Sequence, residues 1–531
     1  MQPVPVPSRR RRYVKRSVTG CRTCRTRRIK CDEAPDACNN CTSTGRKCEG
    51  YDQSRLPIKK RPSTLVGLPD LGGSLGWAVT SDEKRCFFYF QHNSVPSLVG
   101  FFDSQLWQQL ALQMSRADPA VYHAANVLSA LHEDSEITKM RQVGEDLQRP
   151  RHRFALEQAT RSIGLLNRRR ASQDPELPEI MLICCLIFVI AELLLGRYSN
   201  ALGHLRNGLR ILKETQESSA QPVALSIVEA FRFLDVQSSH YVPGGRPFLF
   251  GGDEEVEIYL DEDFDRPLQT LKDARCRVTR LLNVGLPFLA KRYLLSGDGV
   301  QAHYNELSRR QERILSLYNR FRSQFDIFYD QHYSSLSYKE QRGADTIRLQ
   351  YLSQLVAIKA LLFDGHVPDN FAPEYVTLLT THEAFLNKYP ERPTITLDVG
   401  IIPGLYTVAA RSPRYPLRLK AIRALMAWPH NEGIINSNLA ASLAIKSLKA
   451  ELQTRDQRDM PQLMDGAEEE LNQFLHDTMA SAPDVTTWTS VRAAGLADKD
   501  KERSVTPSES GTEEKGTSPS SVWTDDSTST I

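Results

Sequence analysis

Six of the ten cysteines in this 531-residue chain lie between positions 21 and 48. They form two copies of the spacing C-x2-C-x6-C, the second beginning seventeen positions after the first: Cys21, Cys24 and Cys31, then Cys38, Cys41 and Cys48. Two cysteines three positions apart on a helical turn direct both sulfurs toward one ion, and the third cysteine adds a ligand. Each copy supplies three thiolates, whereas a tetrahedral zinc ion needs four. Six cysteines therefore complete two zinc ions if two of the sulfurs bridge them.

Cationic side chains fill the first copy, which reads GCRTCRTRRIKCD. The segment from about Gly20 to Gly50 resembles the fungal binuclear zinc cluster family of transcription factors, whose signature is this doubled cysteine spacing. The resemblance implies that Cys21 and Cys38 are the bridging ligands. One zinc ion would be held by Cys21, Cys24, Cys31 and Cys38, and the other by Cys38, Cys41, Cys48 and Cys21.

The same resemblance implies a contact with DNA. In the family, the first half of the cluster enters the major groove and reads a CGG-type triplet. Arg27 and Arg28 match the contacting pair, and Arg25 and Lys30 lie on either side of them. An arginine can make a bidentate contact with O6 and N7 of guanine. The expected partner is therefore double-stranded DNA.

The charge distribution supports a polyanionic partner. Residues 1–61 contain 17 Lys and Arg against 5 Asp and Glu, a net charge of +12, whereas the whole chain carries +3. Residues 62–531 must then carry −9, so a basic head is joined to an acidic body. Two basic runs, 9–12 and 59–61, bracket the cysteines and are candidates for phosphate contacts or nuclear import signals. We expect the protein in the nucleus.

Other cysteine-rich classes fit the pattern less well. A disulfide framework would accompany a secretory signal, but the N-terminal sequence MQPVPVPSRRRR has no apolar core segment. An RNA-binding zinc knuckle would include histidine, and no histidine lies between Cys21 and Cys48. Iron–sulfur clusters use four cysteines at other spacings. The sequence thus favours a zinc cluster.

Composition divides the chain into five segments. We expect a basic disordered arm over 1–17, the zinc cluster domain over 18–50, a linker over 51–79, an all-helical regulatory domain over 80–480 and a disordered Ser/Thr/acidic tail over 481–531. The linker contains Pro and Gly but no run of three heptads, so the sequence gives no support for a coiled coil there. The fold class is mostly α.

Apolar residues recur at helical spacing in the body. One stripe consists of Tyr198, Leu202, Leu205, Leu209 and Leu212, and another of Ala155, Ala159, Ile163 and Leu166. We expect both stripes to face a core. The most apolar stretch, 180–196, is shorter than a membrane span of about 20 residues and contains Glu192, so a buried helix is expected and no membrane partner. The four cysteines outside the cluster fit reduced thiols of an intracellular protein.

The body also resembles the fungal-specific regulatory domain that accompanies the zinc cluster. The resemblance rests on Gly245-Arg246-Pro247-Phe248-Leu249 at a turn and on the block VGIIPGLYTVAARSPRYPLRLKAIRALMAWPHNEG at 399–433. It implies a regulatory role, with the transcription machinery as a partner, and assigns no ligand-binding residue. Pairing as a homodimer or heterodimer through the helical domain is the candidate mode of assembly.

The two resemblances imply a sequence-specific DNA-binding regulator of RNA polymerase II genes in a fungus, acting on a metabolic pathway or gene cluster. The alternative is a chromatin-associated interaction protein in which the cluster is structural. An enzyme is not expected, because the sequence contains no H-E-x-x-H, P-loop, nucleophile-elbow or dinucleotide-binding motif. The basic residues around the first three cysteines favour the regulator.

Overall fold

The computed structural model describes residues 21–49 and 76–454, with short gaps at 33, 35–36, 143, 173, 219–221, 243–244, 251–263, 265 and 364, together with 469 and 473–474. Expectations for the basic arm, most of the linker and the tail lie outside these residues. The chain forms two compact units, 1–74 and 75–531. About 73% of the structure is helical, and the prediction of a mostly α fold is confirmed.

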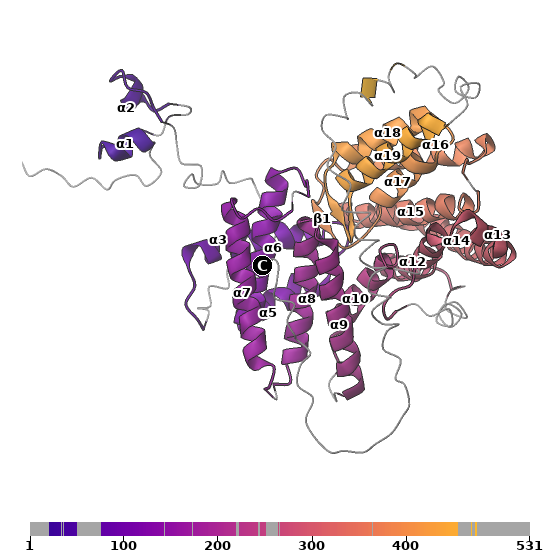
Figure 1. Ribbon diagram of the computed structural model, residues 1–531, viewed down its shortest axis with the longest axis horizontal. Helices are drawn as coiled ribbons and strands as arrows, with labels where there is room; N and C mark the ends of the chain where they lie inside the picture. Colours follow the sequence, from indigo (N-terminus) through magenta and orange to yellow (C-terminus); the bar gives the residue numbers. More distant parts are fainter. Residues whose placement is uncertain are drawn as a thin grey trace, which may run out of the picture. The chain divides into compact units, whose positions relative to one another are not determined.

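The first unit contains two short helices that follow the first cysteine of each repeat. They are α1 (Arg22–Thr26) and α2 (Asn39–Thr42). The second unit begins with α3 (Ser81–Tyr89), whose N-terminus is closed by a capping box between Thr80 and Glu83. Figure 1 shows its helices, purple in the first half and red to orange in the second.

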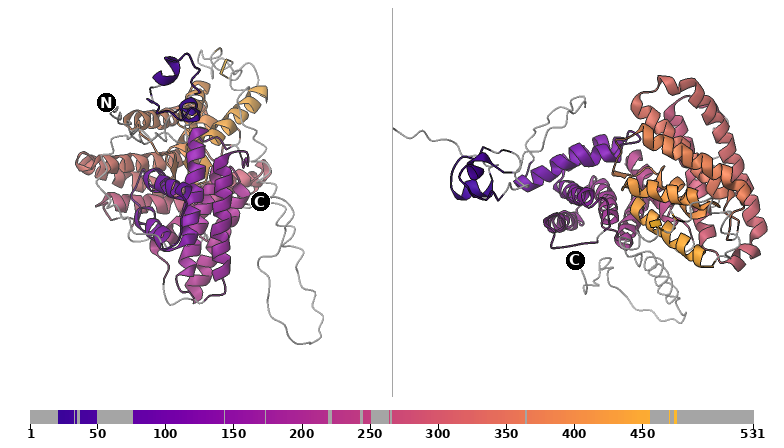
Figure 2. Two further views of the ribbon diagram at one scale, coloured as in Figure 1. Left: turned by 90° about the vertical axis from the view of Figure 1, so that its left-hand side faces the viewer. Right: turned by 90° about the horizontal axis from the view of Figure 1, so that it is seen from above.

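The first half of the large unit has its own core. Its elements are α3, the π-helices η2 (Phe90–Ser94) and η3 (Leu106–Leu110), α4 (Val95–Leu98), α5 (Ala111–Ala117), α6 (Pro119–Ile137), α7 (Pro150–Arg169), α8 (Leu177–Leu194), α9 (Tyr198–Ser218) and α10 (Leu225–Ser238). Figure 2 shows the long purple helices of this half running alongside one another. α6 packs against α7 and α8, and α8 packs against α9. One continuous apolar cluster fills the space between them.

The most apolar helix of this half is α8. By length and composition alone it could cross a membrane, but 72% of its 18 residues are buried inside the unit. It is apolar on all sides because neighbouring helices cover it, which is typical of a central core helix. The predicted stripe on α9 also faces the core: Tyr198, Leu205, Leu209 and Leu212 are buried, and Leu202 is half-buried.

The predicted stripe on α7 is wrong in one position. Ala155 is buried and Ala159 and Leu166 pack against the core, but Ile163 is 42% exposed. The helix instead buries polar side chains beside Ala155, namely His152, Gln158 and Ser162. Apolar periodicity misses this face because hydrogen bonds to α6 and α3 replace apolar packing along it.

The second half of the large unit surrounds a second core. Its helices are α12 (Leu271–Leu294), α13 (Gly297–Ala302), α14 (Tyr304–His332), η5 (Tyr333–Ser335), α15 (Tyr338–Lys359), η6 (Asp369–Phe371), α16 (Ala372–Lys388), α17 (Ile402–Arg411), α18 (Tyr415–Ala427) and α19 (Ser437–Thr454). α15 lies in the middle and packs against α12, α14, α16 and α17. Capping boxes fix the starts of α12, at Thr270 and Asp273, and of α15, at Ser337 and Glu340.

A small sheet, which we did not predict, lies where the two cores meet. β1 (Ile395–Thr396) pairs in parallel with β2 (Asn431–Glu432), which pairs antiparallel with β3 (Ile435–Asn436). Gly433 makes the turn with φ +54°, and a Cβ there would lie 1.8 Å from Oε1 of Gln237. Strands of two residues leave no alternating pattern in the sequence, so the expected all-helical domain is corrected to a mostly helical one.

Polar contacts tie this sheet to the first core. The His132 ring lies 2.7 Å from Oγ1 of Thr394 through Nε2 and 3.0 Å from Oγ of Ser94 through Nδ1. On the other side, the amide side chain of Asn436 donates to the Met140 carbonyl at 3.0 Å. The two cores are therefore joined by hydrogen bonds between residues far apart in the sequence.

Candidate metal centre and nucleic-acid interface

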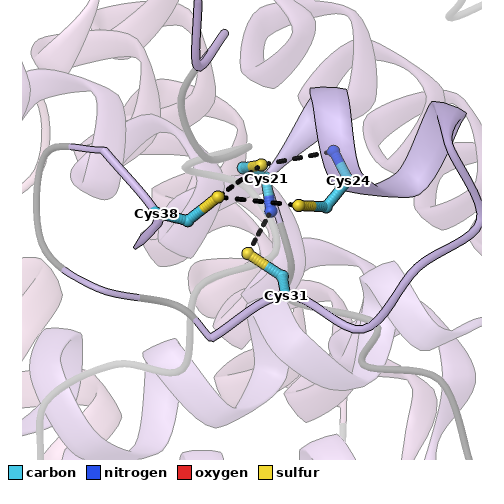
Figure 3. Close-up of side chains that lie close together, drawn as sticks. All are labelled: Cys21, Cys24, Cys31 and Cys38. Carbon is cyan, nitrogen blue, oxygen red and sulfur yellow. Dashed lines mark hydrogen bonds between the residues drawn. The ribbon is translucent and has the colours of Figure 1, made fainter. Parts of the chain in front are cut away.

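The six cysteine sulfurs gather into two overlapping groups of four. One group consists of Cys21, Cys24, Cys31 and Cys38, and the other of Cys21, Cys38, Cys41 and Cys48. Within each group all sulfurs lie within 4.8 Å of one another. Figure 3 shows the first group, with the sulfurs directed toward a common centre. Cys21 and Cys38 are shared by both groups, and their sulfurs are 3.5 Å apart.

The donor set fits zinc. A tetrahedral site with Zn–S bonds of about 2.3 Å places its sulfurs about 3.8 Å apart. Within the two groups, the Cys21–Cys38, Cys24–Cys38 and Cys21–Cys41 sulfurs are 3.5, 3.5 and 3.8 Å apart. No disulfide joins these six cysteines, and every one except Cys48 is buried. Two such sites that share two sulfurs need six cysteines in total. Tetrathiolate coordination of this kind is structural, with no open position for a substrate.

The helix starts position the ligands. Cys21 is the N-cap of α1, and its sulfur accepts a hydrogen bond from the backbone N–H of Cys24 at 3.3 Å. The backbone N–H of Cys21 in turn lies 3.5 Å from the sulfur of Cys31. Burial raises the pKa of the Cys21, Cys24 and Cys38 thiols, because a thiolate loses its hydration there. A bound dication reverses this effect, since it keeps the ligands deprotonated.

The two repeats are linked by matching hydrogen bonds. Thr23, two positions after the first cysteine of its repeat, donates to the carbonyl of Lys47 at 3.3 Å. Asn40, at the same position of the second repeat, donates to the carbonyl of Lys30 at 2.9 Å. Each repeat thus holds the residue before the last cysteine of the other. The sequence analysis missed these links, although the repeat itself aligns the two positions.

An acidic residue closes the start of α2. The carboxylate of Asp32 accepts hydrogen bonds from the backbone N–H groups of Asn39 and Asn40, at 2.9 and 3.1 Å. These bonds lower the pKa of Asp32, the one from Asn39 contributing most. Asp32 therefore fixes the chain after the first repeat to the beginning of the second.

The candidate DNA-contacting residues lie on the segment from Cys24 to Cys31, with Arg25 in the last turn of α1 and the other three on the turn and loop that follow. Arg27 is half-buried and donates to the Asn40 carbonyl at 3.4 Å and to the Thr44 hydroxyl at 3.5 Å. Arg28 and Lys30 are exposed, and Arg25 is half-buried. Arg28 has φ +57°, a left-handed conformation that is uncommon for a residue with a side chain. The four cations thus lie on one segment of the cluster but differ in secondary structure and in exposure.

Buried carboxylates also hold the two motifs on which the resemblance to the regulatory domain rests, the turn at 245–249 and the block at 399–433. Asp235 of α10 is buried and accepts hydrogen bonds from the backbone N–H groups of Phe248, Leu249 and Phe250, at 2.7, 2.9 and 2.7 Å. Burial raises the pKa of Asp235, although these three bonds oppose the shift. The turn at Gly245, with φ +66°, leads into this segment.

A second buried carboxylate holds the 399–433 block. Glu432 of β2 is fully buried and accepts hydrogen bonds from the backbone N–H groups of Gly400, Ile401 and Ile402, at 3.0 to 3.1 Å. These N–H groups open α17, so the negative charge lies at the positive end of that helix. The sequence analysis predicted a capping role for neither acid, because nothing in a local pattern marks a carboxylate that caps a distant segment.

Comparison with known proteins matches both units to fungal domains. Residues 19–57 match the family model of the fungal Zn(2)-Cys(6) binuclear cluster domain, and residues 85–273 match that of the fungal specific transcription factor domain. The predicted resemblances and the two zinc ions are thereby confirmed. The second match ends at residue 273, so the resemblance of the 399–433 block stays a prediction.

Several curated proteins are similar to parts of the chain. The aspercryptin biosynthesis cluster-specific transcription regulator of Emericella nidulans is 28% identical over 310 residues, which are 52% of this chain and 48% of that protein. A transcription regulator of Purpureocillium lilacinum is 25% identical over 298 residues, or 50% of this chain and 70% of that protein. A transcriptional regulatory protein of Schizosaccharomyces pombe is 54% identical over 71 residues, 13% of each chain. The matches thus span about half of the first relative, and no solved structure matches.

Proposed function

We propose that this chain, which carries a Zn(2)-Cys(6) binuclear cluster domain followed by a fungal specific transcription factor domain, is a sequence-specific regulator of RNA polymerase II genes in a fungus. The cluster would bind double-stranded DNA in the nucleus and read a CGG-type triplet. The helical unit would regulate that activity and contact the transcription machinery. Both matched domains are those of regulators, and we propose no enzymatic activity.

The observation that carries the proposal is the basic segment between Cys24 and Cys31. A cluster with a purely structural role needs its cysteines and has no need of Arg25, Arg27, Arg28 and Lys30 on one segment. Two hydrogen bonds hold the backbone of this segment. Asn40 of the second repeat donates to the Lys30 carbonyl, and the Ile29 N–H donates to the Cys24 carbonyl at 3.1 Å. A basic segment held in this way loses little conformational entropy on binding DNA.

We further propose that all six cysteines are zinc ligands, with Cys21 and Cys38 as the bridges. The two overlapping groups of sulfurs support this assignment. The targets are proposed to be genes of a metabolic pathway or gene cluster, because the Emericella nidulans relative is described as specific for a biosynthesis cluster.

Selection of bound sequences from random duplexes by the full-length protein tests the proposal. We expect enrichment of a CGG-type triplet. Lys30→Ala should weaken binding to the selected duplex. Lys47→Ala, at the matching position of the second repeat, is the control and should leave the enriched triplet unchanged. Arg27→Ala or Arg28→Ala should relax the preference at one base pair and cost about 1–3 kcal/mol of specific binding.

A chromatin-associated interaction protein with a structural cluster is the alternative. It would retain two zinc ions but enrich no sequence, and the four cations could then be replaced without effect on DNA selectivity. The selection experiment therefore separates the two functions, because zinc content can be measured on the same samples.

We propose that assembly, where it occurs, uses the helical unit. A single cluster makes few phosphate contacts, so its affinity for one triplet should be low and should fall steeply with salt. A second copy or a related partner would supply the second half-site. Sedimentation of the full chain and of a chain lacking residues 76–531 would separate pairing through the helical unit from pairing near the cluster.

A further inference from the structure

Ile29 is the one large aliphatic side chain between Cys21 and Glu49, where all other apolar residues are cysteines or alanines apart from Pro35. In a unit this small, such a side chain would be expected to pack against the sulfurs. The structure leaves much of it exposed. Ile29 is 39% exposed. Among the described residues of this unit, the partly buried apolar residue that packs against the buried cysteines is Cys48.

The backbone around Ile29 is fixed, so its exposure is built into the loop. Its N–H donates to the Cys24 carbonyl at 3.1 Å, which closes the turn after α1. The next carbonyl, of Lys30, accepts from Asn40 at 2.9 Å. Arg28 before it is left-handed, with φ +57°. These constraints tie the backbone to the cluster and leave the side chains of residues 28–30 exposed.

The surroundings of Ile29 are cationic. Arg28 and Lys30, on either side of it in the chain, are both exposed, and Arg27 lies one residue further away. An apolar side chain among three cations is a poor surface for another protein's apolar patch, because that patch would have to desolvate the charges. It is well suited to a nucleic acid, whose phosphates satisfy the cations.

The major groove offers one kind of apolar group, the methyl group at C5 of a pyrimidine. Thymine carries it, and cytosine carries it after methylation. Apolar side chains recognise the thymine methyl group by direct contact, whereas a cytosine without the methyl group presents C–H there. Burying one methyl group contributes about 0.8 kcal/mol, which corresponds to about fourfold in affinity.

We infer that Ile29 is a specificity-determining residue that contacts a pyrimidine C5-methyl group in the major groove, at a base pair next to or within the triplet read by its neighbours. This inference rests on the proposed function. It adds to it a preference that the arginines cannot supply, since guanidinium groups recognise guanine through O6 and N7.

The test is a double-mutant cycle between the side chain and the methyl group. The full-length protein binds its selected duplex, and each thymine is replaced in turn by deoxyuridine, which lacks only the methyl group. We expect about fourfold weaker binding at one position. Ile29→Ala should bind the parent duplex about fourfold less tightly and should not distinguish thymine from deoxyuridine at that position. Ile29→Val is the conservative control and should retain the discrimination.

A second arm distinguishes the two sources of the methyl group. Each cytosine of the selected duplex is replaced by 5-methylcytosine, and a gain of about fourfold that Ile29→Ala abolishes would assign the contact to a cytosine. The variant should keep two zinc ions, because Ile29 is exposed and is not among the sulfur ligands. Zinc content therefore controls for folding.

Three outcomes overturn the inference and are distinguishable. Specific binding that ignores every deoxyuridine and 5-methylcytosine replacement, or discrimination that survives in Ile29→Ala, would overturn the role of Ile29 alone. Binding without any sequence preference, by a protein that holds two zinc ions, would overturn the proposed function and this inference with it.

Discussion

Arg28 and Gly45 occupy the same position in the two copies of the cysteine repeat, and both have a left-handed backbone, with φ of +57° and +66°. Each lies four positions after the second cysteine of its copy. Glycine adopts this conformation without strain, whereas a residue with a Cβ does so at a cost of about 1–2 kcal/mol. The first repeat bears that cost at a residue that we propose reads DNA, which is where strained backbone tends to occur.

Substitutions at these two positions should separate the stability of the cluster from its binding to DNA. Arg28→Gly should keep two zinc ions, stabilise the cluster by up to about 1 kcal/mol and relax the sequence preference at one base pair. Gly45→Ala should cost about 1 kcal/mol through backbone strain alone, because no atom lies within 4 Å of the added Cβ. Zinc release to a chelator in increasing urea measures the first quantity, and duplex binding the second. Retained sequence preference in Arg28→Gly would show that this side chain does not read a base.

Zinc stoichiometry should reveal which cysteines bridge. Native mass spectrometry of the full chain should show two zinc ions, and Cys48→Ala should retain more zinc than Cys21→Ala or Cys38→Ala. The difference is expected because Cys21 and Cys38 belong to both groups of four sulfurs, whereas Cys48 belongs to one. Cys276→Ala, which removes an exposed thiol elsewhere, should keep both ions. A chain that binds one zinc ion would contradict the shared-sulfur arrangement.

Zinc removal should unfold the cluster without unfolding the helical unit. Residues 21–49 have no core apart from the cysteines, whereas the helical unit has two large apolar cores of its own. Far-ultraviolet circular dichroism should therefore change little on chelation, while protease cleavage between Cys21 and Cys48 should accelerate.

The zinc cluster was predictable from the sequence because its ligands are close together in the chain and its chemistry fixes their number. Cys21 to Cys48 need no distant partner, so their spacing carries the information. The apolar helices α8 and α9 were predictable for a similar reason, since a core face repeats at helical spacing. What was missed depends on residues that meet only after folding. Asp235 and Glu432 are single acids in unremarkable surroundings until each meets three backbone N–H groups.

Removing the Glu432 carboxylate should strongly destabilise the helical unit. Glu432→Ala leaves the buried N–H groups at the start of α17 without an acceptor, and we expect a loss of about 3 kcal/mol or more in the free energy of unfolding. Glu432→Gln keeps one acceptor oxygen and should lose less. Glu391→Ala, an exposed acid near β1, should change stability by no more than about 0.5 kcal/mol. Urea unfolding followed by circular dichroism measures all three, and equal losses in Glu432→Ala and Glu391→Ala would contradict the capping role.

Acid should weaken the contact between the two cores through His132. Burial lowers the pKa of His132 to about 4, from 6.5, although the nearby carboxylate of Glu136 opposes the shift. Between about pH 6.5 and 4, the His132 ring is therefore neutral in the folded protein but protonated in the unfolded protein. Stability is fully present above about pH 6.5 and falls as the pH drops toward 4, by about 3 kcal/mol from this ring. Below about pH 4 both states are protonated, and the ring causes no further loss.

Replacing the ring isolates its share of this pH dependence. His132→Gln should be less stable than the unchanged protein at pH 7, because the contacts with Ser94 and Thr394 are altered, but it should lose less stability between pH 6.5 and 4.5. His204, whose pKa burial also lowers to about 4, should account for part of the dependence that remains. His303→Gln, at an exposed position, should keep the original dependence. The measurement is the urea midpoint at three pH values. Parallel curves for the unchanged protein and His132→Gln would show that His132 is not responsible, since a ring that is protonated equally in the folded and unfolded states gives no such dependence.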